Sequence, residues 1–142
     1  FEAVGERWWS TYFGQLSRLL KPEGRALIQT ITIRDDLFAR YRRGTDFIQQ
    51  YVFPGGMLPS PAVFARNAQR SGLAVRDAFA FGPDYARTLA GWLAAFDTVW
   101  PEISRQGFDE SFRRLWRFYL AYCEAGFRSG CTGVYQFELM HD

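Results

Sequence analysis

Apolar residues recur along this chain at two different intervals, and these intervals predict its helices and strands. Residues 8–20 repeat apolar side chains every three or four positions, which is the period of a helix with one buried face. Residues 21–24 (Lys-Pro-Glu-Gly) end this helix, because proline and glycine both disfavour its continuation. Residues 25–33 form a short apolar run with interleaved threonines and one long polar side chain, Gln29, which indicates a buried strand.

The rest of the chain continues this alternation. Residues 35–51 are mixed and partly helical, and Ser60 followed by Pro61 is a good helix start, with serine as the cap. The later elements are a helix ending near Gly72, a strand over 73–81, a helix opening at 83–84 that Pro101 kinks or ends, a helix capped by Asp109 and running to about 128, and a strand over 134–140. This order predicts an α/β fold. The long helical excursion between the first two strands is typical of a lid at a sheet edge.

Residues 46–60 are the most unusual segment. Apolar and aromatic residues directly precede a Pro-Gly-Gly bend at 54–56. Proline fixes its φ at about −65°, and glycine adopts backbone angles that other residues avoid. Connections normally run through water, so an apolar loop is either buried inside the fold, which is the favoured interpretation from these residues alone, or faces an apolar ligand or membrane. The apolar side chains concerned are Tyr51, Val52, Phe53, Met57 and Leu58.

Composition narrows the class of protein. The 142 residues suggest one domain or a piece of one, and 48% apolar with 18% aromatic residues excludes a disordered chain. No apolar run reaches the roughly 18 residues that span a bilayer, and no secretory signal pattern opens the chain. We therefore expect a cytoplasmic protein. The first residue is Phe1 rather than Met, so we also expect that further residues of a larger protein precede it.

The net charge and the small number of cysteines and histidines exclude several functions for residues 1–142. The net charge of +2 is too small for strong steering of nucleic acid. Cys123 and Cys131 do not match a zinc spacing, and His141 is the only histidine. A histidine-based triad or multi-histidine metal site is therefore excluded here, and we predict no metal.

Six blocks of sequence together resemble a known family. They are FEAVG at 1–5, LLKPEG at 19–24, LIQTI at 27–31, YVFPGGMLPS at 51–60, FGPDYARTLAGW at 81–92 and FYLAYCEAGF at 118–127. In this order they resemble the C-terminal part of the cyclopropane-fatty-acyl-phospholipid synthases, which are related to the mycolic acid cyclopropane synthases. Because several separate blocks agree over nearly the whole chain, the resemblance is specific.

The resemblance implies a fold. The family has the α/β, Rossmann-like fold of class I S-adenosylmethionine-dependent methyltransferases. Residues 1–142 would be the C-terminal part of that catalytic domain and supply its last three strands, with the final strand antiparallel between the other two. Residues 34–60 would be the helical insertion that meets the lipid substrate. The glycine-rich loop that holds S-adenosylmethionine would lie upstream, since no Gly-x-Gly-x-Gly occurs here; no cofactor-binding residue is expected in this chain.

The resemblance also implies a reaction. The family transfers a methylene from S-adenosylmethionine to a cis double bond of a phospholipid acyl chain, which gives a cyclopropane fatty acid. The alkene attacks the sulfonium methyl, a base removes a proton from the transferred methyl, and the ring closes in a dry channel. We expect residues 1–142 alone to be inactive. The alternatives are a lipid C-methyltransferase that gives a methyl-branched product and a non-catalytic lipid-binding module.

Four residues match the family's binding site for bicarbonate, the expected base. Glu2 and Tyr85 match hydrogen-bonding residues, and a glutamate beside an anion must be protonated or share a proton. Ile31 matches a position that acts mainly through its backbone. Gln29 stands where many members have histidine, so it can donate a hydrogen bond but cannot titrate. The residues alone favour another interpretation for two of them, in which Glu2 is a solvated acid and Tyr85 a core tyrosine. For Gln29 they favour equally a bicarbonate-binding residue and a buried strand glutamine with its hydrogen bonds satisfied within the chain.

The resemblance gives the apolar loop a partner. Tyr51, Phe53, Met57 and Leu58 become the expected wall of the acyl-chain channel. The expected partners are phospholipid acyl chains and the membrane surface, with no nucleic acid, and a homodimer is possible. We expect a location peripheral to the inner face of the membrane. Arg40, Arg42 and Arg43 either form a solvated face, which is the favoured interpretation, or meet anionic headgroups.

Overall fold

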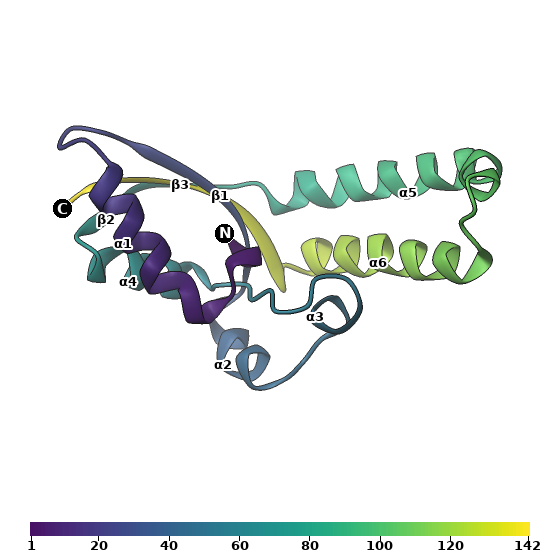
Figure 1. The fold of residues 1–142 in the computed structure, drawn as a ribbon, viewed down its shortest axis with the longest axis horizontal. Helices are drawn as coiled ribbons and strands as arrows, with labels where there is room; N and C mark the ends of the chain where they lie inside the picture. The colour runs from purple at the N-terminus through teal and green to yellow at the C-terminus, as the bar shows by residue number, and fades with distance from the viewer.

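A three-stranded sheet lies at the centre of the chain, and a long helical hairpin projects from one end of it (Figure 1). The computed structural model describes residues 1–142. Strands β1 (Ala26–Ile33), β2 (Leu73–Ala80) and β3 (Thr132–His141) lie in the order β1-β3-β2. Since β3 pairs antiparallel with both neighbours, the predicted antiparallel position of the last strand between the other two is confirmed.

Two helices cover one face of this sheet. The short turns η1 (Glu2–Val4) and η2 (Glu6–Trp8) lead into α1 (Trp9–Leu19), and α4 (Pro61–Arg70) follows later in the chain. Apolar residues of α1 and α4 pack with those of all three strands in one buried cluster. Its members are Phe13, Ile28, Phe64, Ala68, Leu73, Phe137 and Leu139. The first and fourth helices therefore belong to the same layer, as the alternation of helices and strands predicts for an α/β fold.

The helical hairpin forms a second core. Helices α5 (Gly82–Arg105) and α6 (Glu110–Ser129) pack against each other, and Val134 joins their cluster from the start of β3. The other buried members are Ala86, Leu89, Phe96, Trp100, Leu120 and Phe127. The hairpin is anchored to the sheet at this one end, and Figure 1 shows it extending away from there.

Capping residues define the helix starts. The Ser60 hydroxyl accepts a hydrogen bond from the Val63 N–H at 3.4 Å, and Asp109 Oδ1 accepts one from the Phe112 N–H at 2.8 Å. Both predicted caps are therefore confirmed. Pro101 does not end its helix, which continues to Arg105. No helix of the chain is both long and apolar enough to cross a lipid bilayer.

The segment between β1 and α4 contains the predicted helical insertion. It comprises α2 (Asp35–Arg43), α3 (Phe47–Tyr51) and an irregular loop that returns to Ser60. The loop rejoins the sheet where the Ile33 N–H donates to the Pro59 carbonyl oxygen at 2.9 Å. The insertion therefore leaves and re-enters the fold at the carboxyl end of β1, which is the usual side for ligand sites in α/β sheets.

Candidate active site

Glu2 is tied to the sheet by its carboxylate. Glu2 Oε2 accepts a hydrogen bond from the Thr30 hydroxyl at 2.6 Å. Thr30 is buried in the middle of β1, while the Glu2 side chain is 32% exposed. The Phe1 amino nitrogen also lies 3.5 Å from Glu2 Oε2. Thr30 therefore gives the carboxylate its one hydrogen bond from another side chain, and a third of the Glu2 side chain remains open to solvent or a ligand.

Gln29 and Ile31 flank Thr30 but point the other way. Successive side chains of a strand alternate between the two faces of the sheet. Ile31 lies opposite Val134 and packs against the hairpin cluster. Gln29 is exposed, and its Oε1 accepts a hydrogen bond from Gln136 Nε2 at 3.0 Å. The structure therefore places Gln29 and Ile31 on one face, and brings Glu2 to β1 through a side chain that belongs to the opposite face.

Tyr85 lies in the first turn of α5, on the hairpin side. Its ring packs edge-on against Phe127, with ring centroids 5.3 Å apart, and against Phe81 and Trp92 at 6.3 Å each. Ile31 packs against the same cluster as Tyr85. The Tyr85 hydroxyl makes no hydrogen bond within the chain, so its proton is available to a ligand. Ile31 and Tyr85 are thus the two predicted site residues that share one cluster.

These groups supply donors of the kind a small oxyanion needs. The Tyr85 hydroxyl and Gln29 Nε2 both donate hydrogen bonds and neither has a partner for that proton within the chain. The Glu2 carboxylate is acceptor-only when ionised, so it fits beside an anion only when it shares a proton. No hydrogen bond joins Glu2 to Gln29 or Tyr85. These are donors of the kind that bicarbonate accepts from, and the four-residue site stays a prediction.

The apolar loop is more exposed than its composition alone suggests. Tyr51 and Phe53 are 61% and 54% exposed, so the interpretation that these two are buried inside the fold is wrong. Met57 and Leu58 are half-buried. Phe53 lies beside Tyr119 of α6, with ring centroids 6.3 Å apart. The Phe53 ring therefore stands at the surface beside the hairpin, and the Tyr51 ring stands at the surface against Phe47 of its own helix, with ring centroids 5.6 Å apart.

The same loop contacts the segment that carries Glu2. The Met57 N–H donates to the Glu2 carbonyl oxygen at 3.0 Å. A Cβ atom at Gly5 would stand 2.7 Å from the Gly55 carbonyl oxygen, so the two backbones touch there. A cavity of about 510 Å³ lies beside this contact, lined by residues 3–7, Pro54 and Gly55. The predicted acyl-chain wall and the predicted Glu2 site are therefore neighbours.

Two half-buried groups near the loop have raised pKa values. Burial raises the pKa of Tyr41 to about 12, although its hydroxyl accepts a hydrogen bond from the Leu58 N–H at 3.4 Å. Burial, with the negative charge of Asp46 nearby, raises the pKa of Cys123 to about 11. Both groups are therefore neutral at physiological pH, and Cys123 is a poor nucleophile.

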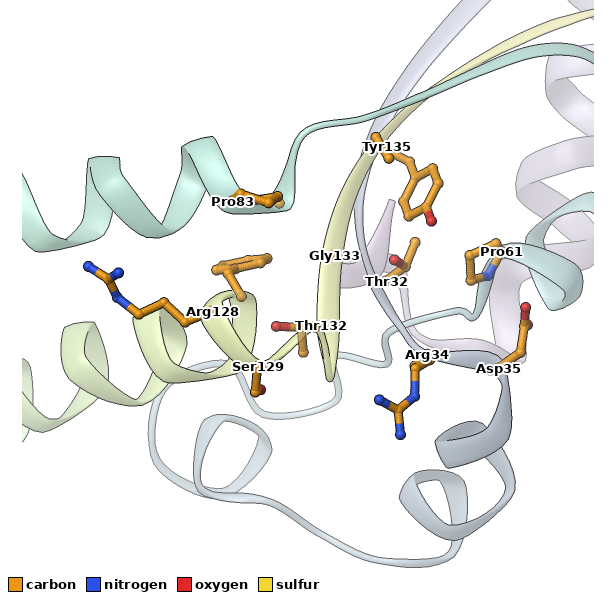
Figure 2. A pocket seen from close by; sticks show the side chains of 14 residues that line it. Thr32, Arg34, Asp35, Pro61, Pro83, Arg128, Ser129, Thr132, Gly133 and Tyr135 are labelled. Atoms are coloured by element: carbon orange, nitrogen blue, oxygen red, sulfur yellow. The ribbon is translucent and has the colours of Figure 1, made fainter.

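A second cavity, of about 400 Å³, lies where β1 and β2 end and β3 begins (Figure 2). Thr32 and Tyr135 face it from the strands, and Arg34 and Arg128 stand on opposite sides of it. Arg34 pairs with Asp36 and Arg128 with Glu124, each at 2.6 Å. No sequence pattern predicts this cavity, because the residues that line it are scattered between positions 32 and 135 and share no motif.

Comparison with known proteins identifies relatives over almost the whole chain. The family described as "Mycolic acid cyclopropane synthetase" matches residues 1–137. The tuberculostearic acid methyltransferase UfaA1 of Mycobacterium tuberculosis is 44% identical over 142 residues, which cover 99% of this chain and 33% of that protein. The cyclopropane-fatty-acyl-phospholipid synthase of Escherichia coli K12 is 37% identical over 137 residues, which cover 96% and 34%.

Solved structures of the same family also superpose on almost the whole chain. The cyclopropane synthase MmaA2 from M. tuberculosis superposes with a TM-score of 0.85 at 27% identity and covers 98% of this chain and 52% of that one. The mycolic acid cyclopropane synthase CmaA1, complexed with SAH and CTAB, superposes with a TM-score of 0.86 at 30% identity, with the same coverage. The predicted methyltransferase-type α/β fold is confirmed. The chain spans about one third of these curated relatives and about half of the solved chains.

Proposed function

Because the chain belongs to the mycolic acid cyclopropane synthetase family, we propose that it is part of a lipid-modifying methyltransferase that uses S-adenosylmethionine. The proposed reaction adds a methylene across a cis double bond of a phospholipid acyl chain and gives a cyclopropane ring. The match over residues 1–137 carries this proposal. The exposed aromatic loop beside Glu2 supports it, because an acyl chain needs an apolar surface next to the reacting groups.

The proposed roles of individual residues follow from the positions at which they match the family. S-adenosylmethionine would supply the methyl group, and we assign none of its contacts to residues 1–142. Glu2, Gln29, Tyr85 and the backbone of Ile31 would hold bicarbonate, which would supply the base. The Tyr85 hydroxyl would donate toward the ion, and the buried Phe127 ring that packs edge-on against Tyr85 would keep water from one side of it. Met57 and Leu58, together with Tyr51 and Phe53, would line the path of the acyl chain.

A second candidate function differs in the product. UfaA1, the 44% identical relative, is named a tuberculostearic acid methyltransferase. In this alternative the alkene takes the methyl group, and a proton leaves from a position that does not close the ring. The product is then a branched chain that keeps a double bond. The ring product has no double bond left, so hydrogen uptake on catalytic hydrogenation, measured beside the product mass, separates the two.

The proposed location is cytoplasmic and peripheral to the inner face of the membrane. Arg40 and Arg43 are exposed at the end of α2, whereas Arg42 pairs with Glu6 at 2.8 Å. A basic residue near an anionic membrane surface contributes about 1 kcal/mol to binding. The basic turn and the exposed aromatic residues Tyr51 and Phe53 belong to the same insertion, which suits a surface that meets headgroups and acyl chains together.

The test uses the full-length protein with labelled S-adenosylmethionine and vesicles of unsaturated phospholipid. We expect label in a cyclopropane product. Replacement of Glu2 by Gln and of Tyr85 by Phe should lower kcat at least about 10-fold, as expected for lost hydrogen bonds at a reacting centre, and change vesicle binding little. Glu102→Gln is the matched control, because Glu102 is exposed at the far end of α5. A branched product would favour the second candidate, and vesicle binding without transfer would leave a lipid-binding module.

A further inference from the structure

Gln49 links the exposed aromatic loop to the rest of the insertion through both ends of its side-chain amide. Its Oε1 accepts a hydrogen bond from the Asp46 N–H at 3.1 Å, and its Nε2 donates to the Gly56 carbonyl oxygen at 3.0 Å. A rotated amide would place donor against donor and acceptor against acceptor, so the orientation of Gln49 is fixed. Gln49 thus joins the start of α3 to the far side of the bend.

Helix α3 depends on the same residue. Asp46 Oδ1 accepts a hydrogen bond from the Gln49 N–H at 2.8 Å, which completes a reciprocal capping box. A helix as short as Phe47–Tyr51 has little stability of its own. Contacts such as the capping box and the packing of Phe47 against Phe118 of α6, with ring centroids 4.7 Å apart, therefore hold it in place.

The loop transmits this constraint to Glu2. Gly56 accepts from Gln49, and the next residue, Met57, donates its N–H to the Glu2 carbonyl oxygen at 3.0 Å. The Glu2 carboxylate in turn accepts from Thr30 in β1 at 2.6 Å. An unbroken series of hydrogen bonds and short backbone links therefore runs from α3, through the bend, to the middle of β1.

We propose that Gln49 is a positioning residue that fixes Glu2 relative to the lipid-facing loop. The inference rests on the proposed function, since it gives Glu2 a role in the reaction. Tyr51 and Phe53 lie between Gln49 and Gly56, the two residues that this link joins, and carry the exposed rings. Without Gln49 the bend is free to move away from Glu2, while the rings that contact lipid remain. The expected defect is therefore in turnover and not in lipid binding.

The first experiment does not depend on activity. Amide hydrogen exchange is measured on the full-length protein for Gln49→Ala, Gln49→Glu and the control Gln50→Ala, whose side chain is exposed and makes no hydrogen bond. Loss of one neutral hydrogen bond should speed exchange of the Met57 amide about 5-fold in both Gln49 variants, with the amides of β3 unchanged. Gln49→Glu keeps an acceptor for the Asp46 N–H, loses the donor to Gly56, and sets a carboxylate oxygen against the Gly56 carbonyl oxygen. Unchanged Met57 exchange in both variants would overturn the proposal.

The second experiment is a double-mutant cycle with Glu2→Gln. Displacement of a reacting group by about 1 Å costs on the order of 100-fold in rate, so Gln49→Ala should lower kcat about 10-fold or more and leave vesicle affinity within about 2-fold. Added to Glu2→Gln, it should lower kcat little further, because both act at one place. Fully multiplicative losses would overturn the role. A wild-type enzyme without lipid turnover would refute the proposed function, whereas the exchange result would still report on the link.

Discussion

Replacing Thr30 by Val removes one hydroxyl and tests whether the sheet holds Glu2. Valine has a similar volume and prefers strands, so the buried site keeps its packing. The change deletes the 2.6 Å hydrogen bond to Glu2 Oε2. Hydrogen bonds to charged groups contribute about 1.5–3 kcal/mol. Because the Glu2 side chain is 32% exposed, water can replace part of the lost contact, and the lower end of this range applies.

The matched control is Thr32→Val. Thr32 lies two residues further along β1, points to the same face and is as buried as Thr30, at 2% exposure for both. It makes no hydrogen bond to an acidic side chain. Chemical denaturation of the full-length protein, followed by tryptophan fluorescence, gives the free energy of unfolding of each variant. We expect Thr30→Val to be less stable than Thr32→Val by about 1.5 kcal/mol.

Turnover provides a second reading of the same change. Without the Thr30 hydroxyl, Glu2 is free to turn toward solvent, so kcat should fall in Thr30→Val and stay near wild type in Thr32→Val. The reasoning fails if the free energies of unfolding of the two variants differ by less than about 0.5 kcal/mol, the usual range for neutral substitutions, and their kcat values are the same. The hydrogen bond to Glu2 would then contribute nothing.

Two further predictions concern the backbone contact and the buried tyrosine. Gly5→Ala should destabilise the protein by about 2 kcal/mol or more, because φ is +77° and the new Cβ would meet the Gly55 oxygen at 2.7 Å. Gly91→Ala, with open space around it in α5, should instead stabilise the protein by up to about 1 kcal/mol. Melting temperatures that shift in the same direction in both variants would contradict this prediction. Tyr41, with its pKa raised from 10.0 to about 12, contributes stability that is present below pH 10 and is lost as pH rises toward 12; Tyr41→Phe should lose less stability over that interval, and parallel losses in both proteins would refute it.

Much of the fold follows from local patterns. The short apolar run at 25–33 predicts a buried strand and the alternation at 134–140 predicts a strand with one buried face, and the structure has strands at Ala26–Ile33 and Thr132–His141. Ser60 and Asp109 mark helix starts because their side chains satisfy free backbone N–H groups. Pro101 does not by itself predict where its helix ends. A proline costs a helix one hydrogen bond, but the helix continues when packing on both sides of the proline continues. Phe96, Trp100 and Ile103 provide that packing.

The site is less predictable because it depends on the directions in which side chains point, and the composition of a segment does not determine these directions. The sequence places Tyr51 and Phe53 in an apolar loop, but their exposure depends on how the short helix α3 lies against α6. The link through Gln49 is likewise invisible in sequence, since Gln49 and Gln50 are identical side chains in adjacent positions. Only the capping box at Asp46 turns the first toward Gly56 and leaves the second in solvent.

The Thr30 hydroxyl can satisfy Glu2 in either protonation state. Its single proton has two acceptors within reach, Glu2 Oε2 at 2.6 Å and the Ile31 carbonyl oxygen at 3.1 Å. When Glu2 is ionised, the hydroxyl donates to the carboxylate. When Glu2 carries a proton, Glu2 donates to the hydroxyl oxygen, and the hydroxyl proton turns to Ile31. If Glu2 lies beside a bound anion, as proposed, a hydroxyl held between these two acceptors keeps a hydrogen bond to the carboxyl group whether or not that group shares a proton.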